Sequence, residues 1–454
     1  MKQDTDKPSR GDSPLFFQRR FLPMWTALSF GTFADNTLRQ ALLIGIPAGV
    51  IAVPFFSDSD NAIPFIGALL PIAILIFSSV SGQLADKFET SLMFRRTKFI
   101  ELLLMTSAAI AFASGTGWLA IAMLFAMGAQ SAFFSPVRVS AMPKYLAPDE
   151  LVRGNGLCNA GLFTFILVGY MVGGSLIVLE NGGAMVGVVL ISASSIGFFA
   201  ATRTPWAAAN APELKISFNG FTQTISMFRH VFNSPGVAPP LMGSAVFYFL
   251  STAITVVIPL YGRDALFATP LVWAALNGLF AIGAGLGAIT AASMSKNRSG
   301  LGASTIAIGC SGLMSFVIYA ITPLAAGTPE APIGLGGLFT QPMGILLTLS
   351  LVFTAALSGV YIAPLQAATQ RRAPSTFRAR IMAAGAFSNA MFAIPGSLSI
   401  LAVTGLGINP RLAFIALGCV MLLICAVMMY RKKANAEGLY DEVLHAAHKA
   451  NTNL

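Results

Sequence analysis

Residues 21–50 read FLPMWTALSFGTFADNTLRQALLIGIPAGV, and this stretch decides the class of fold. A membrane-spanning helix needs about 20 mainly apolar residues, and the run is long enough to supply them. Asp35, Asn36 and Arg39 interrupt it near its middle. The run starts after a polar tail and is too long for a cleaved signal peptide. It therefore predicts a retained transmembrane helix that carries polar groups inside the membrane.

The composition of the whole chain agrees with a membrane protein. Of 454 residues, 55% are hydrophobic and 10% are charged, and the mean hydropathy is +0.74. Soluble domains usually carry about 25% charged residues. So few charges cannot cover a soluble protein of this length. The composition excludes a soluble enzyme, a nucleic-acid-binding protein and a disordered scaffold, and we expect membrane lipids rather than nucleic acid around the chain.

Apolar runs recur along the chain at membrane-spanning length. None shows the strict alternation of a barrel strand, so we interpret them as helices. They predict an all-α membrane protein with twelve transmembrane helices in two six-helix parallel repeats. The runs occupy residues 21–50, 63–84, 97–115, 117–138, 153–179, 182–201, 239–262, 270–294, 301–322, 343–370, 380–403 and 409–430.

The longest polar break between runs, residues 202–238, separates six runs from six. A weak internal sequence repeat supports the division, because Gly174-Ser175-Leu176 recurs as Gly396-Ser397-Leu398. Parallel repeats build one class of secondary transporters, with the substrate site between the halves. The predicted units are a tail, a first half, a linker, a second half and a tail, at residues 1–20, 21–201, 202–238, 239–430 and 431–454.

The linker contains apolar side chains at three- and four-residue spacing. This spacing predicts a short amphipathic helix on the inner membrane surface. A segment packed against its own protein explains the pattern equally well. The residues concerned are Phe218, Phe221, Ile225, Phe228 and Phe232.

The basic residues give the orientation. All 28 lysines and arginines lie on one predicted side of the membrane, except Arg39 inside the first run and Arg263 and Arg411 on the other side. Cytoplasmic loops carry the excess of basic residues in membrane proteins. We therefore expect both termini in the cytoplasm, which requires an even number of spans, and we interpret the net charge of +10 as a topology signal.

Cofactor chemistry has no signature in the sequence. The four cysteines lie within apolar runs without metal-ligand spacing, and the three histidines do not cluster within the membrane. A phosphate-binding Gly-Lys-Ser/Thr loop is also missing from the sequence. We expect no enzyme activity, no metal and no cofactor.

Asp35, Asn36 and Arg39 are the strongest candidates for substrate binding. A charge at the centre of a membrane helix costs about 2.5–3.5 kcal/mol on insertion scales, which makes such residues rare. Asp35 and Arg39 are four residues apart and share a helix face, where they can partly neutralise each other. The functional interpretation is a cavity site, with Arg39 for a phosphate and Asp35 for an amine or a proton. The alternative is a pair that only stabilises the bundle.

The loop after the second run is the candidate gate. Gly82, followed four residues later by Asp86 and then by Lys87, resembles the loop signature of the major facilitator superfamily. The second glycine and the paired basic residues of that signature are replaced, and Arg95 and Arg96 are expected to supply the charge. Lys98 and Glu101 are expected to join this network. The predicted gate residues are Gly82, Asp86, Lys87, Arg95, Arg96, Lys98, Glu101 and Arg138. For Arg138, the alternative is a solvated charge that only sets the topology.

Amides in the apolar runs are further candidates. Gln130, Asn155 and Asn159 are predicted to bind substrate from the fourth and fifth runs. Asn277, Gln366 and Asn389 are possible cavity residues of the second half. Amides in membrane helices also simply bond a neighbouring helix, so both roles stay open.

Several segments together resemble one branch of the superfamily, the bacterial lysophospholipid transporters. They are Gly31–Arg39, the Gly82 loop, Gln130–Arg138, and Leu146–Asn155 with Gly169 and Gly173-Gly174 beyond it. The resemblance implies inward movement of lysophospholipid across the inner membrane, with acylation by a separate acyltransferase. It also implies that Arg39 pairs with the phosphodiester, Asp35 with an ethanolamine ammonium, and phenylalanines line an acyl path.

Two other functions compete with this expectation. A proton-coupled exporter of drugs or amphiphilic metabolites would use Asp35 or Glu101 as its proton carrier. The segment Gly169–Gly174 partly resembles the fifth-span signature of such antiporters, but Tyr170 stands where a proline is expected and Phe165 where a glycine is expected. A membrane anchor for a lipid-modifying enzyme is the third possibility.

Overall fold

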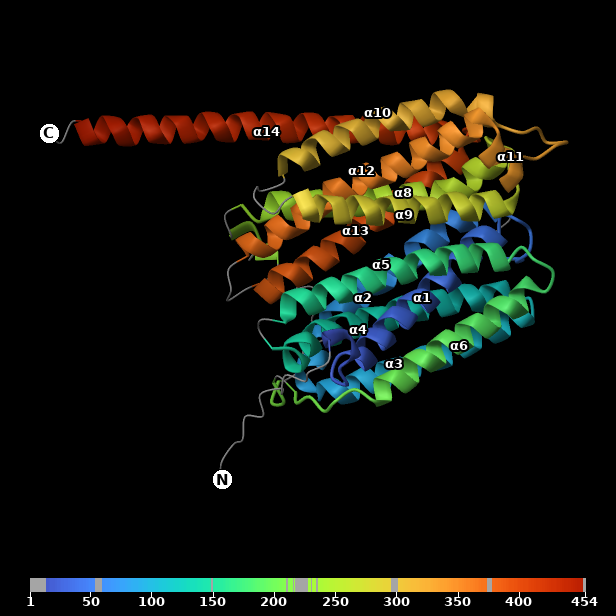
Figure 1. Cartoon of the computed structure of the whole chain (residues 1–454), viewed down its shortest axis with the longest axis horizontal. Coiled ribbons are helices and arrows are strands. Elements are labelled where there is room, and N and C mark those ends of the chain that lie inside the picture. Colours follow the sequence, from blue (N-terminus) through green and yellow to red (C-terminus); the bar gives the residue numbers. More distant parts are fainter. Residues whose placement is uncertain are drawn as a thin grey trace.

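The computed structural model is a bundle of long helices that run side by side, with both termini on the same end (Figure 1). It describes residues 14–53, 59–147, 150–209, 211–214, 216, 228–229, 231–233, 236–294, 301–373 and 378–451. Within these ranges the secondary structure is helical apart from one isolated β-bridge between Ala268 and Ile333. The all-helical class predicted from the sequence is confirmed.

Each apolar run predicted from the sequence overlaps one long helix, and the runs 21–50, 97–115, 153–179 and 409–430 extend a few residues beyond theirs. In the first half these are α1 (Leu22–Gly45), α2 (Ser59–Lys87), α3 (Thr90–Ala113), α4 (Gly117–Tyr145), α5 (Leu151–Leu176) and α6 (Gly182–Thr202). In the second half they are α8 (Ala238–Asp264), α9 (Pro270–Met294), α10 (Leu301–Ala325), α12 (Pro342–Arg372), α13 (Arg378–Gly405) and α14 (Leu412–Asn451). The short helix α11 (Leu335–Thr340) and a 3-10 turn at Leu15–Phe17 complete the described elements.

Nine helices of the described chain are long and apolar enough to cross a membrane. They are α2, α4, α6, α8, α9, α10, α12, α13 and α14, so the protein is a multi-pass membrane protein. Helices α1 and α3 are long enough but not apolar enough to be counted among these nine, because they carry the charged residues described below. That all twelve helices cross the membrane as two repeats stays a prediction.

The apolar core is continuous at one end of the bundle and divided at the other. One cluster of buried side chains joins both halves, and it includes Leu42 and Ile63 of the first half and Val256 and Trp273 of the second. At the end where the termini lie, two smaller clusters are separate. One packs Phe21, Phe94 and Tyr145 of the first half, and the other packs residues such as Leu241 and Ile381 of the second half.

Hydrogen bonds between the halves lie at the end opposite the termini. The Ser397 hydroxyl on α13 donates to the Pro64 carbonyl on α2 at 2.6 Å. About two turns further along α13, Thr404 Oγ1 donates to Asn61 Oδ1 of α2 at 3.2 Å. Gly174 of α5 packs directly against Ala274 of α9. Helices α2 and α13 and helices α5 and α9 therefore form the contact between the halves at this end.

Most of the linker lies outside the described residues. Phe218, Phe221 and Ile225 are among the residues not described, so the predicted amphipathic helix stays a prediction. Phe228 packs edge-on against Phe387 of α13 with ring centroids 5.8 Å apart, whereas Phe232 is 67% exposed. The end of the linker thus contacts the second half and also presents an apolar side chain outward.

Cysteines placed at Asn61 and Thr404 should be joined by a short thiol-specific cross-linker in membranes. The expected result follows from the hydrogen bond between these two side chains, and it needs a background in which the four native cysteines are replaced by alanine. A shift in gel mobility measures it, with each single-cysteine variant as a control. Failure of the double variant to cross-link would contradict the closed contact at this end.

Candidate functional site

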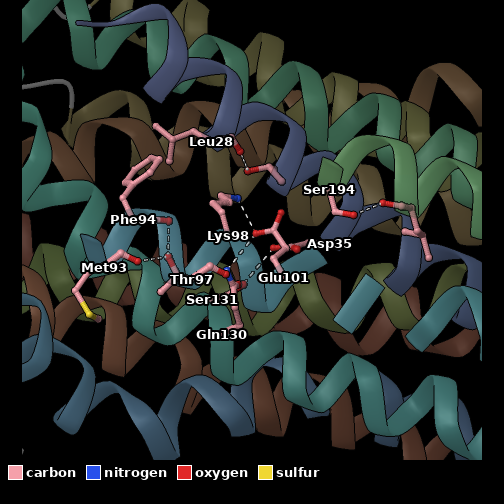
Figure 2. A network of polar contacts seen from close by, with 12 residues as sticks. Leu28, Asp35, Met93, Phe94, Thr97, Lys98, Glu101, Gln130, Ser131 and Ser194 are labelled. Carbon is pink, nitrogen blue, oxygen red and sulfur yellow. Dashed lines mark hydrogen bonds and ion pairs between the residues drawn. The ribbon is translucent and has the colours of Figure 1, made fainter. Parts of the chain in front are cut away.

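A buried ion pair on α3 is the centre of the polar network in the first half. Lys98 Nζ lies 2.6 Å from Glu101 Oε2, and the two side chains are 1% and 2% exposed. The residues are three positions apart and share a helix face. Gln130 Nε2 of α4 donates to Glu101 Oε2 at 3.1 Å and to the Thr97 carbonyl at 3.0 Å (Figure 2). The pair is thus tied to two helices.

The neighbouring helices leave space for this pair. A Cβ at Gly31 of α1 would collide with Lys98 Nζ and lie 3.0 Å from Glu101 Oε1. The Lys98 ammonium also lies 4.4 Å from the centre of the Phe134 ring, a cation–π contact with α4. Glu101 Oε1 has no hydrogen-bond partner among the described residues. A larger residue at position 31 would therefore force the Lys98 ammonium away from its present place beside Glu101.

Asp35 of α1 extends the network toward α4. Its Oδ2 accepts a hydrogen bond from Ser131 Oγ at 3.1 Å, and its carboxylate lies beside Glu101 in Figure 2. Its other oxygen, Oδ1, is buried and has no partner in the described structure. Asn36 instead donates to the Thr32 carbonyl of its own helix at 2.7 Å. Two carboxylates therefore lie close together, each with one unpaired oxygen.

Arg39 does not pair with Asp35. Its Nη1 donates to the Tyr170 hydroxyl of α5 at 2.9 Å, while Asp35 bonds to α4. Arg39 Nε is buried without a partner among the described residues. The expected mutual neutralisation is thus absent from this structure, because each charged group has its own polar partner on a different helix.

The predicted gate divides into two places. Lys98 and Glu101 bond to each other inside the bundle, and Glu101 accepts a hydrogen bond from Gln130 rather than contacting the Gly82 loop. Arg95 Nη2 donates to the Thr204 carbonyl at 3.2 Å, and the Asp86 carbonyl accepts from the Ala211 amide at 2.8 Å. Arg96 and Asp86 are exposed, and Gly82 and Lys87 are partly exposed. These residues lie at the end of the bundle that holds the termini.

Arg138 lies apart from both groups. It is half-buried on α4, close enough to Cys158 of α5 and Tyr248 of α8 to interact with both electrostatically. Tyr248 belongs to the second half, so Arg138 faces across the division between the halves. The side chains of Asn155 and Asn159 lie outside the described residues, and their predicted role stays a prediction.

Contacts around the ends of α3 and α4 were not predicted from the sequence. Lys144 Nζ donates to Thr90 Oγ1 and to the Ala208 carbonyl, both at 2.6 Å. Burial lowers the pKa of the Lys144 amine below its usual range, and the nearby Asp86 carboxylate acts in the opposite direction. The segment after α6 is thereby fixed across the ends of α3 and α4.

A second such contact joins the N-terminal segment to the connection between α4 and α5. Arg20 donates to both carboxylate oxygens of Glu150, at 2.7 and 2.6 Å, and to the Tyr145 carbonyl at 3.0 Å. A bidentate pair of this kind fixes geometry as well as charge. The sequence holds no signal for it, because the partners are 130 positions apart.

Among the described residues, the second half supplies amides rather than charges to the interior. Asn277 of α9 is fully buried, and neither polar atom of its side chain has a partner in the described structure. Gln40 of α1 is buried and unpaired in the same way. Gln366 is exposed, and Asn389 is partly buried with an unpaired oxygen. The structure does not bring Gln366 and Asn389 into the network around Glu101.

Gly31→Ala should destabilise the protein by about 1–3 kcal/mol, the usual effect of overpacking a dense interior. The added methyl group displaces Lys98 from Glu101 or separates α1 from α3. Thermal unfolding of the purified protein in detergent measures the change. Gly82→Ala is the matched control, because a Cβ there meets no atom within 4 Å. Equal stability of the two variants would contradict the close packing of α1 over the pair.

Lys98→Met alone should destabilise the protein by about 3–5 kcal/mol, because it leaves Glu101 as an unpaired buried charge. Lys98→Met combined with Glu101→Gln should recover most of that loss. The same unfolding measurement tests this. A double variant as unstable as the single variant would show that the pair is not an electrostatic unit.

Comparisons with known proteins identify the family and agree with the fold. A family model described as transmembrane secretion effector matches residues 24–383. The lysophospholipid transporter LplT of Citrobacter koseri is 26% identical over 326 residues, which cover 69% of this chain and 76% of that protein. LplT of Enterobacter sp. is 25% identical, over 73% of this chain and 80% of that protein.

Solved structures share the architecture. A POT family transporter in complex with a thioalcohol-conjugated peptide superposes with a TM-score of 0.65 at 14% identity, over 90% of this chain and 96% of that chain. A D-xylose–proton symporter gives a TM-score of 0.65 at 12% identity, with the same two coverages. At such identities the similarity shows the fold alone. With the family match over most of its length, the chain belongs to the major facilitator superfamily, in the family described as transmembrane secretion effector.

Proposed function

We propose that the protein is a secondary transporter that moves lysophospholipid across the bacterial inner membrane toward the cytoplasm. The observation that carries the proposal is the separation of charge on α1. Arg39, held by Tyr170, and Asp35, held by Ser131, are one helical turn apart, about 6 Å along the axis. A cation and an anion that do not pair with each other complement a zwitterionic phosphoethanolamine headgroup.

The relatives support the substrate class. The curated relatives named above are lysophospholipid transporters, and the alignment with the Citrobacter protein covers about two thirds of this chain. Gln130 lies in the same network and would hold Glu101 in place during binding. We assign Asn36, Asn155 and Asn159 to the substrate site by their place in the sequence. The re-acylation of the imported lipid falls to a separate acyltransferase.

The division of the core supports a mechanism of alternating access, which is part of the proposal. The halves share one apolar cluster at the end opposite the termini and have separate clusters at the end with the termini. If both termini are cytoplasmic, this arrangement corresponds to a state closed to the outside. The Asp86, Arg95 and Lys144 contacts would then belong to the inner gate, which stabilises the first half as it moves.

Purified protein in proteoliposomes should take up labelled lysophosphatidylethanolamine. Asp35→Asn and Arg39→Gln should each lower the initial rate at least about tenfold, since a charge-assisted hydrogen bond contributes about 1.5–3 kcal/mol. Expression and detergent extraction should stay at the level of the wild type. Arg411→Gln is a matched control, because Arg411 also contacts a tyrosine, Tyr319, but in the second half, just before the start of α14. Uptake equal to that of empty vesicles would contradict the proposed substrate.

A proton-coupled exporter of amphiphiles is the second candidate. The adjacent carboxylates of Asp35 and Glu101, each with one unpaired oxygen, favour it. The exporter predicts substrate-driven proton movement in vesicles that is lost in Asp35→Asn. Lysophospholipid uptake without proton movement would support the lysophospholipid transporter and contradict the proton-coupled exporter.

A further inference from the structure

Helix α5 presents a ridge of four-residue spacing to α1, formed by Gly161, Phe165, Gly169 and Gly173. The three glycines allow close backbone approach. A Cβ at Gly161 would lie 2.7 Å from Trp25 Nε1, one at Gly169 would lie 2.8 Å from the Phe33 carbonyl, and one at Gly173 would collide with the Thr37 carbonyl. Phe165 is the one large side chain on a ridge that otherwise brings the two helices into contact.

Phe165 inserts among aromatic side chains of α1. Its ring centroid lies 5.1 Å from Phe30, 6.0 Å from Trp25 and 6.3 Å from Phe33. Phe16 continues the series, with its centroid 4.8 Å from Trp25. We call these five residues the aromatic seam. All five are only half-buried, so the seam retains accessible apolar surface.

An anion-binding group lies at one end of the seam. Arg39 donates to Tyr170, which follows Phe165 on α5, and Tyr170 is 8% exposed. A guanidinium has five N–H donors, and the described residues accept from Arg39 only at Tyr170, with Nε buried and unpaired. Phe165 and Tyr170 are also the two positions where α5 departs from the glycine and proline pattern of drug antiporters.

The dimensions fit a lipid with a single acyl chain. Trp25 and Arg39 are 14 positions apart on one helix, which corresponds to about 21 Å along its axis. The hydrocarbon core of a bilayer is about 30 Å thick and holds two layers of chains, so one chain spans about 15 Å. The glycerol ester between the phosphate and the chain adds to this length, so a phosphate at Arg39 places the acyl chain along Phe33 and Phe30, with its end directed toward Trp25.

We propose that the aromatic seam and the Arg39–Tyr170 pair together bind one single-chain phospholipid, with the phosphodiester on Arg39 and the acyl chain along the seam. This inference rests on the proposed function and adds the place of the acyl chain and two binding residues, Phe165 and Tyr170. With cytoplasmic termini, the headgroup points outward, as it does in the outer leaflet. The seam then holds the lipid before its headgroup crosses.

Phe165→Ala should change the preference for acyl chain length in proteoliposome uptake. The KM for a long-chain lysophosphatidylethanolamine should rise about tenfold, and that for a short-chain analogue by less than threefold, since each methylene that loses full burial costs about fourfold in affinity. Phe198→Ala is the matched control. The Phe198 ring on α6 packs at a tilt against Phe99 of α3 and Phe199 of α6, with centroids 5.6 Å apart, and its loss should leave both KM values unchanged.

The outcomes separate this inference from the proposed function. If the wild type transports the lipid and Phe165→Ala keeps the chain-length profile, or shifts both KM values equally, the seam is only helix packing. If the wild type transports nothing, the proposed function fails. Binding then decides about the seam: a lysophospholipid with a brominated chain should give saturable quenching of tryptophan fluorescence that is lost in Trp25→Phe and kept in Trp118→Phe. Saturable quenching that persists in Trp25→Phe would overturn the inference. This binding test does not depend on Phe165→Ala, so it also applies if that variant does not fold.

Discussion

The Lys98–Glu101 ion pair is the constraint on which the first half depends. Two charges in a low-dielectric interior are tolerated only when they are paired and hydrogen-bonded. The surroundings meet this requirement, with an amide from Gln130, an aromatic face from Phe134 and, at Gly31, the absence of a side chain whose place the Lys98 ammonium takes. The same requirement accounts for the lower hydropathy of α1 and α3, since the helices that hold the network cannot also be uniformly apolar.

Helix α5 packs against α1 through small residues rather than through charged groups. Glycines bring the backbones together, as is common where membrane helices pack without a hydrophobic driving force between them. Phe165 and Tyr170 interrupt this close contact, one with an apolar ring and the other with a hydroxyl on Arg39. Helix α1 therefore meets charge and amides on α3 and α4, and aromatic surface on α5. An amphiphile requires such a division between polar and apolar contacts.

The sequence predicted the helices well because twenty-residue apolar runs have few alternative structures. It also selected Asp35, Arg39, Lys98, Glu101 and Gln130 as polar residues of interest. The sequence did not show which of these residues bond to one another. Helical spacing brings Asp35 and Arg39 together, but rotation of α1 against α4 and α5 decides that they bond to Ser131 and Tyr170 instead. Contacts such as Arg20 with Glu150 have no local pattern at all, because only the tertiary fold makes them neighbours.

The two halves differ in how they use polarity. In the described structure the charged groups deep in the bundle belong to the first half, whereas the second half contributes amides such as Asn277 and hydroxyls such as Ser397. Charged networks are costly to rearrange, while a single hydroxyl–carbonyl bond contributes only about 0.5–1.5 kcal/mol. In the alternating access that we propose, the bond from Ser397 to Pro64 can therefore break and form again as the halves move. In such a cycle the first half would keep its network intact while the second half moves against it. The first half could then hold the headgroup throughout the cycle.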